Sequence, residues 1–350
     1  MSPTPVIPDH DRGSTPPVIP DLIGDPSPMD SRAWPGMTVT ELITQSARQL
    51  EAAGVAFGHG TDNAHDEAAW LVLWRLGLPL DTPLDDPASN PDSKANQAVS
   101  PVQQGDVAML LEARIHTRKP AAYLTQEAWL MGVPFYVDER AIVPRSLIAE
   151  LLFDESLDYW LGADTRRALD LCTGNGSLAV LAAMVWPDLT VDASDLSADA
   201  LAVARINIDK HGLQDRITLV TSDGLAQVRG PYDLIICNPP YVNARSMAAL
   251  PAEFKAEPAL ALDGNQAGSV DGMDFIRGLL AQAPAHMTPG AVLLLEIGNE
   301  RDNFEAAFPK LEPIWLATSA GEDQVLLLTC EALQSLSERG EAWIPGRGRE

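Results

Sequence analysis

The chain has 350 residues, of which 46% are apolar, and a formal net charge of −25 at pH 7. This length and apolar content allow a substantial core and suggest two domains. The strongly acidic balance opposes binding to nucleic-acid phosphate and suits a basic partner. No apolar run reaches transmembrane length and no cationic-then-apolar signal peptide opens the sequence. We therefore expect a cytoplasmic protein with no membrane contact.

Residues 1–36 hold nine of the 28 prolines and repeat the phrase Pro-Val-Ile-Pro-Asp at residues 5–9 and 17–21. No helix or strand period is present there, so we predict a disordered tail. The ordered pattern begins near Met37, and a translation start at Met29 or Met37 would leave the tail untranslated.

Residues 37–120 have the pattern of a small helical domain. A polar loop rich in Pro and Asp, near residues 81–104, interrupts the helical pattern. The expected helices start at Thr38, cover residues 66–74 and cover residues 106–118.

The next segment, residues 121–145, is expected to link this domain to the rest of the chain. Residues 128–131 and 134–137 have strand-like composition and flank Gly132-Val133. This spacing predicts a β-hairpin with its turn at residues 132–133.

From residue 146 onward, short apolar runs alternate with helical patterns. Repeated strand–helix units of this kind form doubly wound, mostly parallel sheets. We therefore predict an α/β domain over residues 146–330, followed by a loose tail over residues 331–350. The seven expected strands cover residues 168–172, 190–194, 217–220, 232–237, 291–297, 313–317 and 324–330.

The three cysteines, Cys172, Cys237 and Cys330, lie far apart in or beside these apolar runs. Neither they nor the six histidines have the spacing of metal ligands. We predict buried, unreactive thiols and no metal site.

The first strand of the α/β domain ends in Asp170-Leu171-Cys172-Thr173-Gly174-Asn175-Gly176-Ser177 and leads into a helix. Glycines at such a turn let the backbone approach a ligand, and the helix N-terminus offers free N–H groups. Asp195 follows the second strand, 21 residues after Gly174, where an acidic side chain binds ribose hydroxyls. This pattern fits both a nicotinamide dehydrogenase and an S-adenosylmethionine methyltransferase.

Three features favour the methyltransferase. Asp170 precedes the glycine turn, where it could meet a cationic amino group but no pyrophosphate. Asp223-Gly224 follows the third strand, in position to contact an adenine edge. The fourth strand ends in Asn238-Pro239-Pro240-Tyr241, which hydride transfer does not require. Each Asp alone could instead be a helix cap or a turn residue.

The tetrapeptide Asn238-Pro239-Pro240-Tyr241 follows a buried, apolar strand, where open α/β sheets place their ligand chemistry. The prolines fix φ and leave carbonyl oxygens with no N–H of their own. Together with the Asn238 amide they form a rigid set of hydrogen-bond acceptors for a substrate amino group. The alternative is a turn that only ends the strand.

With these residues, the chain resembles the protein-glutamine N5-methyltransferases, a class I methyltransferase family with a Rossmann-like sheet. The resemblance runs from about Met37 to Cys330. The glycine turn and the run from Val143 to Glu150 resemble the branch that acts on large-subunit ribosomal protein three. That branch often has Ser and Cys where this chain has Asn175 and Ser177. Two further runs support the resemblance, over residues 250–260 and 271–275.

The resemblance implies S-adenosyl-L-methionine as cofactor and methyl transfer to a glutamine side-chain nitrogen. Asn238 and the Pro239 carbonyl would accept the two amide N–H groups, and Tyr241 would wall the slot. The expected catalytic residues are Asn238, Pro239, Pro240 and Tyr241. The expected cofactor-binding residues are Asp170, Thr173, Gly174, Asn175, Gly176, Asp195, Asp223, Gly224 and Asn238.

The implied partner is large-subunit ribosomal protein three, with residues 37–120 as the candidate recognition domain. One alternative is methylation of peptide-chain release factors by the same chemistry. A second is an adenine-N6 nucleic-acid methyltransferase, which usually needs a basic groove that this sequence lacks. A third is a non-catalytic ribosome-assembly factor that keeps the fold as a scaffold. We expect no nucleic-acid specificity.

Overall fold

The computed structural model describes residues 36–84, 93–162 and 164–338. They form two compact units, and each is built around its own core. The first unit contains the residues up to Ala128 together with Pro251–Ala256, and the second contains the remainder. The predicted tail over residues 1–36 lies outside the described residues, apart from Gly36. None of the described helices is both long and apolar enough to cross a membrane.

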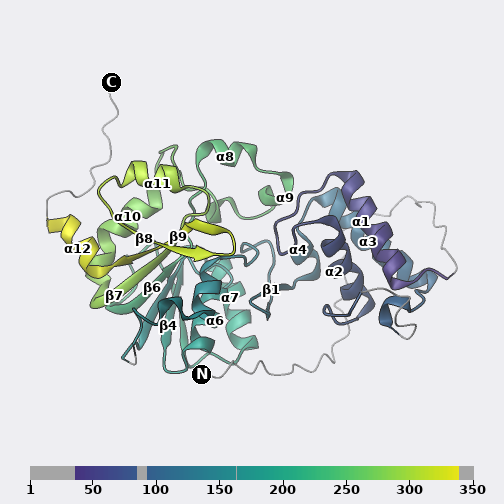
Figure 1. The fold of residues 1–350 in the computed structure, drawn as a ribbon, viewed down its shortest axis with the longest axis horizontal. Helices are drawn as coiled ribbons and strands as arrows, with labels where there is room; N and C mark the ends of the chain where they lie inside the picture. The colour runs from purple at the N-terminus through teal and green to yellow at the C-terminus, as the bar shows by residue number, and fades with distance from the viewer. Residues whose placement is uncertain (1–35, 85–92, 163, 339–350) are drawn as a thin grey trace. The chain divides into compact units, whose positions relative to one another are not determined.

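Helices α1 to α4 build the first unit (Figure 1). Thr38 caps α1 by accepting a hydrogen bond from the Glu41 N–H, while the Glu41 side chain accepts one from the Thr38 N–H. This reciprocal cap satisfies N–H groups that have no partner inside the helix. The helices are α1 (Val39–Ala53), α2 (Ala64–Leu76), α3 (Pro101–Thr117) and α4 (Ala121–Thr125), with a short 3-10 helix over Lys94–Asn96.

Helix α3 begins at Pro101, earlier than the residue 106 that the apolar pattern predicts. Ser100 and Gln103 form a capping box. Proline suits the first helical position because the backbone N–H that it lacks would have no partner inside the helix there. The first turn is exposed, so its apolar period is weak and only the cap marks the true start. Residues 85–92 of the predicted polar loop lie outside the described residues.

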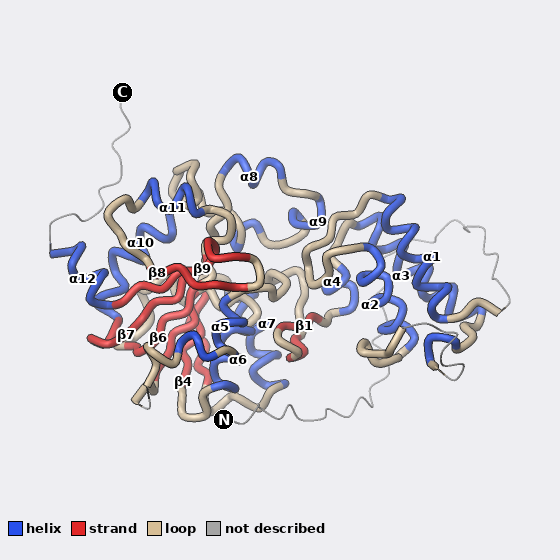
Figure 2. Tube along the Cα trace, viewed as in Figure 1, coloured by secondary structure: helices blue, strands red, loops and turns tan. Residues whose placement is uncertain are grey.

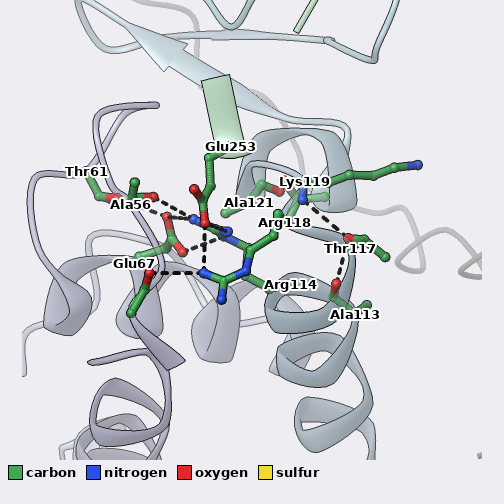
Figure 3. Close-up of polar contacts among 12 residues, drawn as sticks. Ala56, Thr61, Glu67, Ala113, Arg114, Thr117, Arg118, Lys119, Ala121 and Glu253 are labelled. Atoms are coloured by element: carbon green, nitrogen blue, oxygen red, sulfur yellow. Dashed lines mark hydrogen bonds and ion pairs between the residues drawn. The ribbon is translucent and has the colours of Figure 1, made fainter. Parts of the chain in front are cut away.

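A buried ion cluster ties the segment Pro251–Ala256 to helices α2 and α3 within the first unit (Figure 3). Arg114 is fully buried and donates to Glu67 Oε1 at 2.8 Å and to the Ala56 carbonyl at 2.9 Å. Its Nη1 also contacts Glu253 Oε1 at 3.4 Å. Arg118 reaches the same Glu253 oxygen at 3.2 Å. Each buried carboxylate therefore has a cationic partner, as burial of a charge requires.

Replacing Arg114 with alanine is expected to destabilise the first unit by about 3–5 kcal/mol, because Glu67 and Glu253 would lose a buried partner. Hydrogen exchange of the α2 and α3 amides measures this loss. Arg75 provides a matched control, since its 3.1 Å pair with Asp106 is partly exposed and Arg75→Ala should cost about 1 kcal/mol or less. Equal effects of the two substitutions would contradict a special role for the buried cluster.

The predicted hairpin is present as β1 (Ala128–Leu130) and β2 (Val133–Phe135). Its turn lies at Met131-Gly132, one residue before the predicted position. Both turn residues have positive φ, 51° and 75°, as a tight two-residue hairpin turn requires. Gly132 therefore occupies the second turn position without strain, whereas Met131 occupies the first position with a strained, positive φ.

A seven-stranded sheet forms the centre of the second unit (Figure 2). Its strand order is β5-β4-β3-β6-β7-β9-β8. Only the pairings of β9 are antiparallel. The predicted doubly wound, mostly parallel α/β sheet is thus confirmed. The strands are β3 (Arg167–Leu171), β4 (Thr190–Asp195), β5 (Ile217–Thr221), β6 (Tyr232–Cys237), β7 (Met287–Glu296), β8 (Ile314–Thr318) and β9 (Gly321–Thr329).

Alternate residues along the central strands enter two cores, one on each face of the sheet. In β6, for example, Leu234 and Ile236 pack with α5, α6 and α7, whereas Ile235 and Cys237 pack with α10, α11 and α12. The helices of this unit are α5 (Ile148–Phe153), α6 (Ser177–Val185), α7 (Ala198–Lys210), α8 (Ala244–Ala249), α10 (Asp274–Gln282), α11 (Arg301–Ala307) and α12 (Cys330–Glu338). Helix α9 (Ala252–Lys255) belongs to the first unit.

The sequence predicts a loose tail from residue 331, but its first part is helix α12. Leu333 of this helix is buried in the core that α10 and α11 share. Residues 339–350 lie outside the described residues.

Candidate functional site

A pocket opens at the carboxyl edge of the sheet, beside the ends of β3, β4, β5 and β6. Strand order reverses here, since β3 lies between β4 and β6, and open α/β sheets bind ligands at such a point. The pocket holds about 770 Å³ of open space, counting the part that faces solvent. The predicted site residues that line it are Gly174, Asp195, Asp223, Gly224, Asn238 and Pro240.

Asp170 lies at the base of the β3–α6 turn and is buried. Its Oδ2 accepts hydrogen bonds from the Thr173 hydroxyl at 2.5 Å and from the Ala179 N–H at 3.0 Å. Its Oδ1 has no hydrogen-bond partner among the described residues. Burial raises the pKa of Asp170 to about 7, against the lowering effect of these two hydrogen bonds. A buried carboxylate oxygen without a partner is a place for a ligand donor.

Asp195, the last residue of β4, braces the glycine turn. Its Oδ2 accepts the Gly174 N–H at 2.9 Å, and its Oδ1 accepts the Ser197 N–H at 2.8 Å. Burial raises the pKa of Asp195 above its usual range. Each oxygen keeps a further lone pair, so the carboxylate can also accept hydrogen bonds from ligand hydroxyl groups.

Gly176 and Asn175 serve the turn itself rather than the pocket lining. A Cβ on Gly176 would lie 3.0 Å from the Ala204 Cβ, so this glycine permits close packing of the turn on α7. Asn175 is buried, and its Oδ1 accepts the Ser177 N–H at 3.2 Å. Thr173 is likewise buried, with its hydroxyl on Asp170.

Asn238 follows β6 directly and lies partly exposed at the pocket wall. Its side-chain amide forms no hydrogen bond with any other described residue. Pro239 and Pro240 are buried, and Pro240 also lines the pocket. The Tyr241 ring lies against Gly298, where a Cβ would come within 2.7 Å of its Cε2. Asn238 is therefore joined to a rigid, buried backbone segment, and its side-chain amide is available to form hydrogen bonds with a ligand.

The pocket has further walls that we did not predict as site residues. Phe275 of α10 lies beside Gly224, and Leu196 follows Asp195. Five further wall residues lie at or after the ends of β3, β4 and β5 or on α7: Leu171, Cys172, Ser197, Ala200 and Ser222. The others come from the segments before α5 and after α9: Arg140, Ala141, Ile142, Pro258, Leu260, Ala261 and Gln266. Except for Leu171 and Cys172 in the glycine turn, these wall residues belong to no binding motif in the sequence. Only the runs at residues 250–260 and 271–275, which support the family resemblance, include some of them.

The thiols of Cys237 and Cys330 are buried, as predicted, but Cys172 is only partly buried and lines the pocket. A hydrogen bond with Cys237, together with burial, raises the pKa of the Cys172 thiol well above its usual range. Such a thiol stays protonated and unreactive. Among the described residues, no group of three or more His, Cys, Asp or Glu side chains could hold a metal ion.

The family model of the methyltransferase small domain matches residues 150–265. A ribosomal protein uL3 glutamine methyltransferase from Bordetella pertussis is 52% identical to this chain, over 85% of this chain and 97% of the relative. The chain belongs to the ribosomal protein uL3 glutamine methyltransferase family. Relatives of the same name from Burkholderia pseudomallei and Neisseria gonorrhoeae are each 47% identical, over 88% and 85% of this chain and 100% and 95% of the relatives.

This membership confirms the resemblance found in the sequence, including its branch. The seven-stranded sheet is the class I methyltransferase fold expected of the family. The pocket at its carboxyl edge is accordingly the candidate active site of a methyltransferase.

Proposed function

We propose that this protein transfers a methyl group from S-adenosyl-L-methionine to the side-chain amide nitrogen (N5) of a glutamine in ribosomal protein uL3. The observation that carries the proposal is the available amide of Asn238 in the same pocket as Gly174 and Asp195. Membership of the uL3 glutamine methyltransferase family supports the choice of substrate.

The predicted cofactor-binding residues, whether they line the pocket or support the glycine turn behind it, suit each part of the cofactor. Asp170 Oδ1 is buried without a partner and offers a negative charge to an α-amino group. Asp195 keeps lone pairs that would accept ribose hydroxyls, and Asp223 and Gly224, which line the same pocket, would contact the adenine. Gly174 gives the backbone a positive φ of 55° at the turn, and Gly176 lets the turn pack on α7. Thr173 and Asn175 hold the turn in shape.

Asn238 and Pro239 hold the glutamine amide. An amide nitrogen is a poor nucleophile because its lone pair is delocalised into the carbonyl. Asn238 Oδ1 and the Pro239 carbonyl accept its two N–H groups, which orients the nitrogen and stabilises positive charge that develops on it. Bound S-adenosylmethionine supplies an electrophilic methyl group on its sulfonium. The bond from the nitrogen to the methyl would form as the sulfonium S–C bond breaks and S-adenosylhomocysteine leaves. The nitrogen would afterwards lose one proton to solvent, so no strong base is needed first.

Ribosomal protein uL3 is a protein substrate, and we assign its recognition to the helical residues 37–120. A charge of −25 suits a basic ribosomal protein and opposes a nucleic-acid substrate. A ribosomal substrate supports a cytoplasmic location for the reaction.

The test is to incubate the full chain and labelled S-adenosylmethionine with unmethylated uL3, an unmethylated release factor and ribosomal RNA in separate reactions. We expect label on uL3 alone. Label on the release factor instead would support glutamine methylation but would show that uL3 is not the substrate. Label on RNA, or on none of the three, would refute the proposal.

A further inference from the structure

Glu296 is a buried carboxylate that the mechanism above does not use. It is the last residue of β7, and only 4% of its surface is exposed to solvent. It accepts the Ser146 hydroxyl at 2.5 Å and the Leu147 N–H at 2.9 Å. No salt bridge to it is present among the described residues, and burial raises its pKa. These two donors leave acceptor capacity on the carboxylate.

The hydroxyl of Tyr241, the last residue of the Asn-Pro-Pro-Tyr run, lies beside Glu296, and burial together with this carboxylate raises the pKa of Tyr241 well above its usual range. The ring of Tyr241 lies on Gly298, where a Cβ would come within 2.7 Å of Cε2 and 3.0 Å of Cζ and the hydroxyl oxygen. Gly298 has a φ of 51°, so both its conformation and the ring favour glycine there. The Tyr241 ring thus packs against Gly298, two residues after Glu296, and its hydroxyl lies beside the Glu296 carboxylate.

The backbone around Tyr241 is held as closely as its ring. A Cβ on Gly272 would lie 2.1 Å from the Tyr241 carbonyl oxygen, so only glycine fits against that carbonyl. Two residues further on, the Asn243 amide donates to Glu300 at 2.7 and 2.9 Å. The loop that leaves Asn238 is therefore fixed at both Tyr241 and Asn243.

We propose that Glu296 is a positioning residue for methyl transfer: held by Ser146 and Leu147, its carboxylate fixes the Tyr241 ring as the wall of the amide slot beside Asn238. The proposal deepens the function proposed above and rests on it. The Ser146 hydroxyl and the Leu147 N–H donate to Glu296 and the Tyr241 hydroxyl lies beside it, and an ionised carboxylate has acceptor sites for all three. A glutamine there has one acceptor oxygen and places an N–H₂ donor against a hydroxyl, so it cannot hold the same arrangement.

The test compares Tyr241→Phe, Glu296→Gln and the double variant on unmethylated uL3. We expect each single change to lower kcat roughly 10- to 100-fold, as a small misplacement of reacting groups does. The Kd for S-adenosylmethionine and the Tm of Tyr241→Phe should stay at wild-type values, which separates positioning from a structural role. The double variant should be no slower than the slower single variant, because both changes remove one contact.

Tyr232 provides the matched control. It starts the same strand β6, and its hydroxyl donates to Asp192 at 2.7 Å, away from the carboxyl edge. Tyr232→Phe should therefore keep wild-type kcat. Wild-type kcat in Tyr241→Phe, or fully additive losses in the double variant, would overturn the positioning role. A wild-type protein that does not methylate uL3 would refute the proposed function itself, which is a different result.

Discussion

Replacing Asn238 with alanine is expected to lower kcat on uL3 about 10²- to 10³-fold, the loss found when one preorganised transition-state hydrogen bond is removed. The affinity for S-adenosylmethionine should change little. Asn238 is partly exposed and bonds to no other described side chain or backbone group, so the substitution leaves no buried group without a partner. The loss should therefore appear in turnover and not in folding.

The measurement is single-turnover methyl transfer to uL3, with cofactor affinity and Tm determined on the same preparations. Asn303→Ala is a suitable control, because this amide lies on α11 and bonds to Glu300 at 2.5 Å without lining the pocket. Unchanged turnover in Asn238→Ala, with normal cofactor affinity, would remove Asn238 from the mechanism.

Replacing Asp170 with asparagine is expected to stabilise the ligand-free protein and to weaken cofactor binding. Asp170 has a folded-state pKa of about 7, raised from 3.8 by burial. The folded state therefore holds its proton more tightly than the unfolded state, and stability falls as the pH rises from about 4 through 7. Asparagine keeps an acceptor for Thr173 and Ala179 and carries no charge. At pH 8 it should add up to about 4 kcal/mol of stability.

Denaturant unfolding of the two proteins at pH 4 and pH 8 measures this effect. The advantage of Asp170→Asn should be large at pH 8 and small at pH 4, where the folded-state carboxyl is protonated and the unfolded-state carboxyl, with its pKa of 3.8, is close to half protonated. Cofactor affinity should show the opposite behaviour: the wild type should weaken as the pH falls below 7, and the variant should be weak throughout. Lower stability of the variant at pH 8 would contradict the assignment of a strained, buried charge.

The sheet was predictable because its strands are short, apolar and separated by clear helical patterns. Strand β6 has the bounds that the sequence predicts, and Asn238 and Pro240, which follow it, line the pocket. The glycine turn was less informative at Gly176, which is among the expected cofactor-binding residues but packs against Ala204. The spacing of glycines identifies a turn that requires glycine, but it does not show whether a ligand or another part of the protein packs against each glycine.

The buried charge networks could not be predicted, because their partners lie far apart in the sequence. Arg114 meets Glu253 across 139 residues, and Ser146 meets Glu296 across 150. No local period marks such pairs. Glu296 ends an apolar strand and Glu253 lies in a short helix that the pattern does not predict. Only the fold brings these partners together.

The most direct test of the account is to locate the methyl group on uL3. Wild-type protein labels uL3 with isotopic S-adenosylmethionine, the labelled peptide is sequenced by mass spectrometry, and part of it is hydrolysed in acid. We expect the label on one glutamine and its release as methylamine, because hydrolysis cleaves a methylated side-chain amide. Acid hydrolysis does not release methylamine from a methylated lysine, arginine or amino terminus. Label on any of these groups would contradict transfer to glutamine N5.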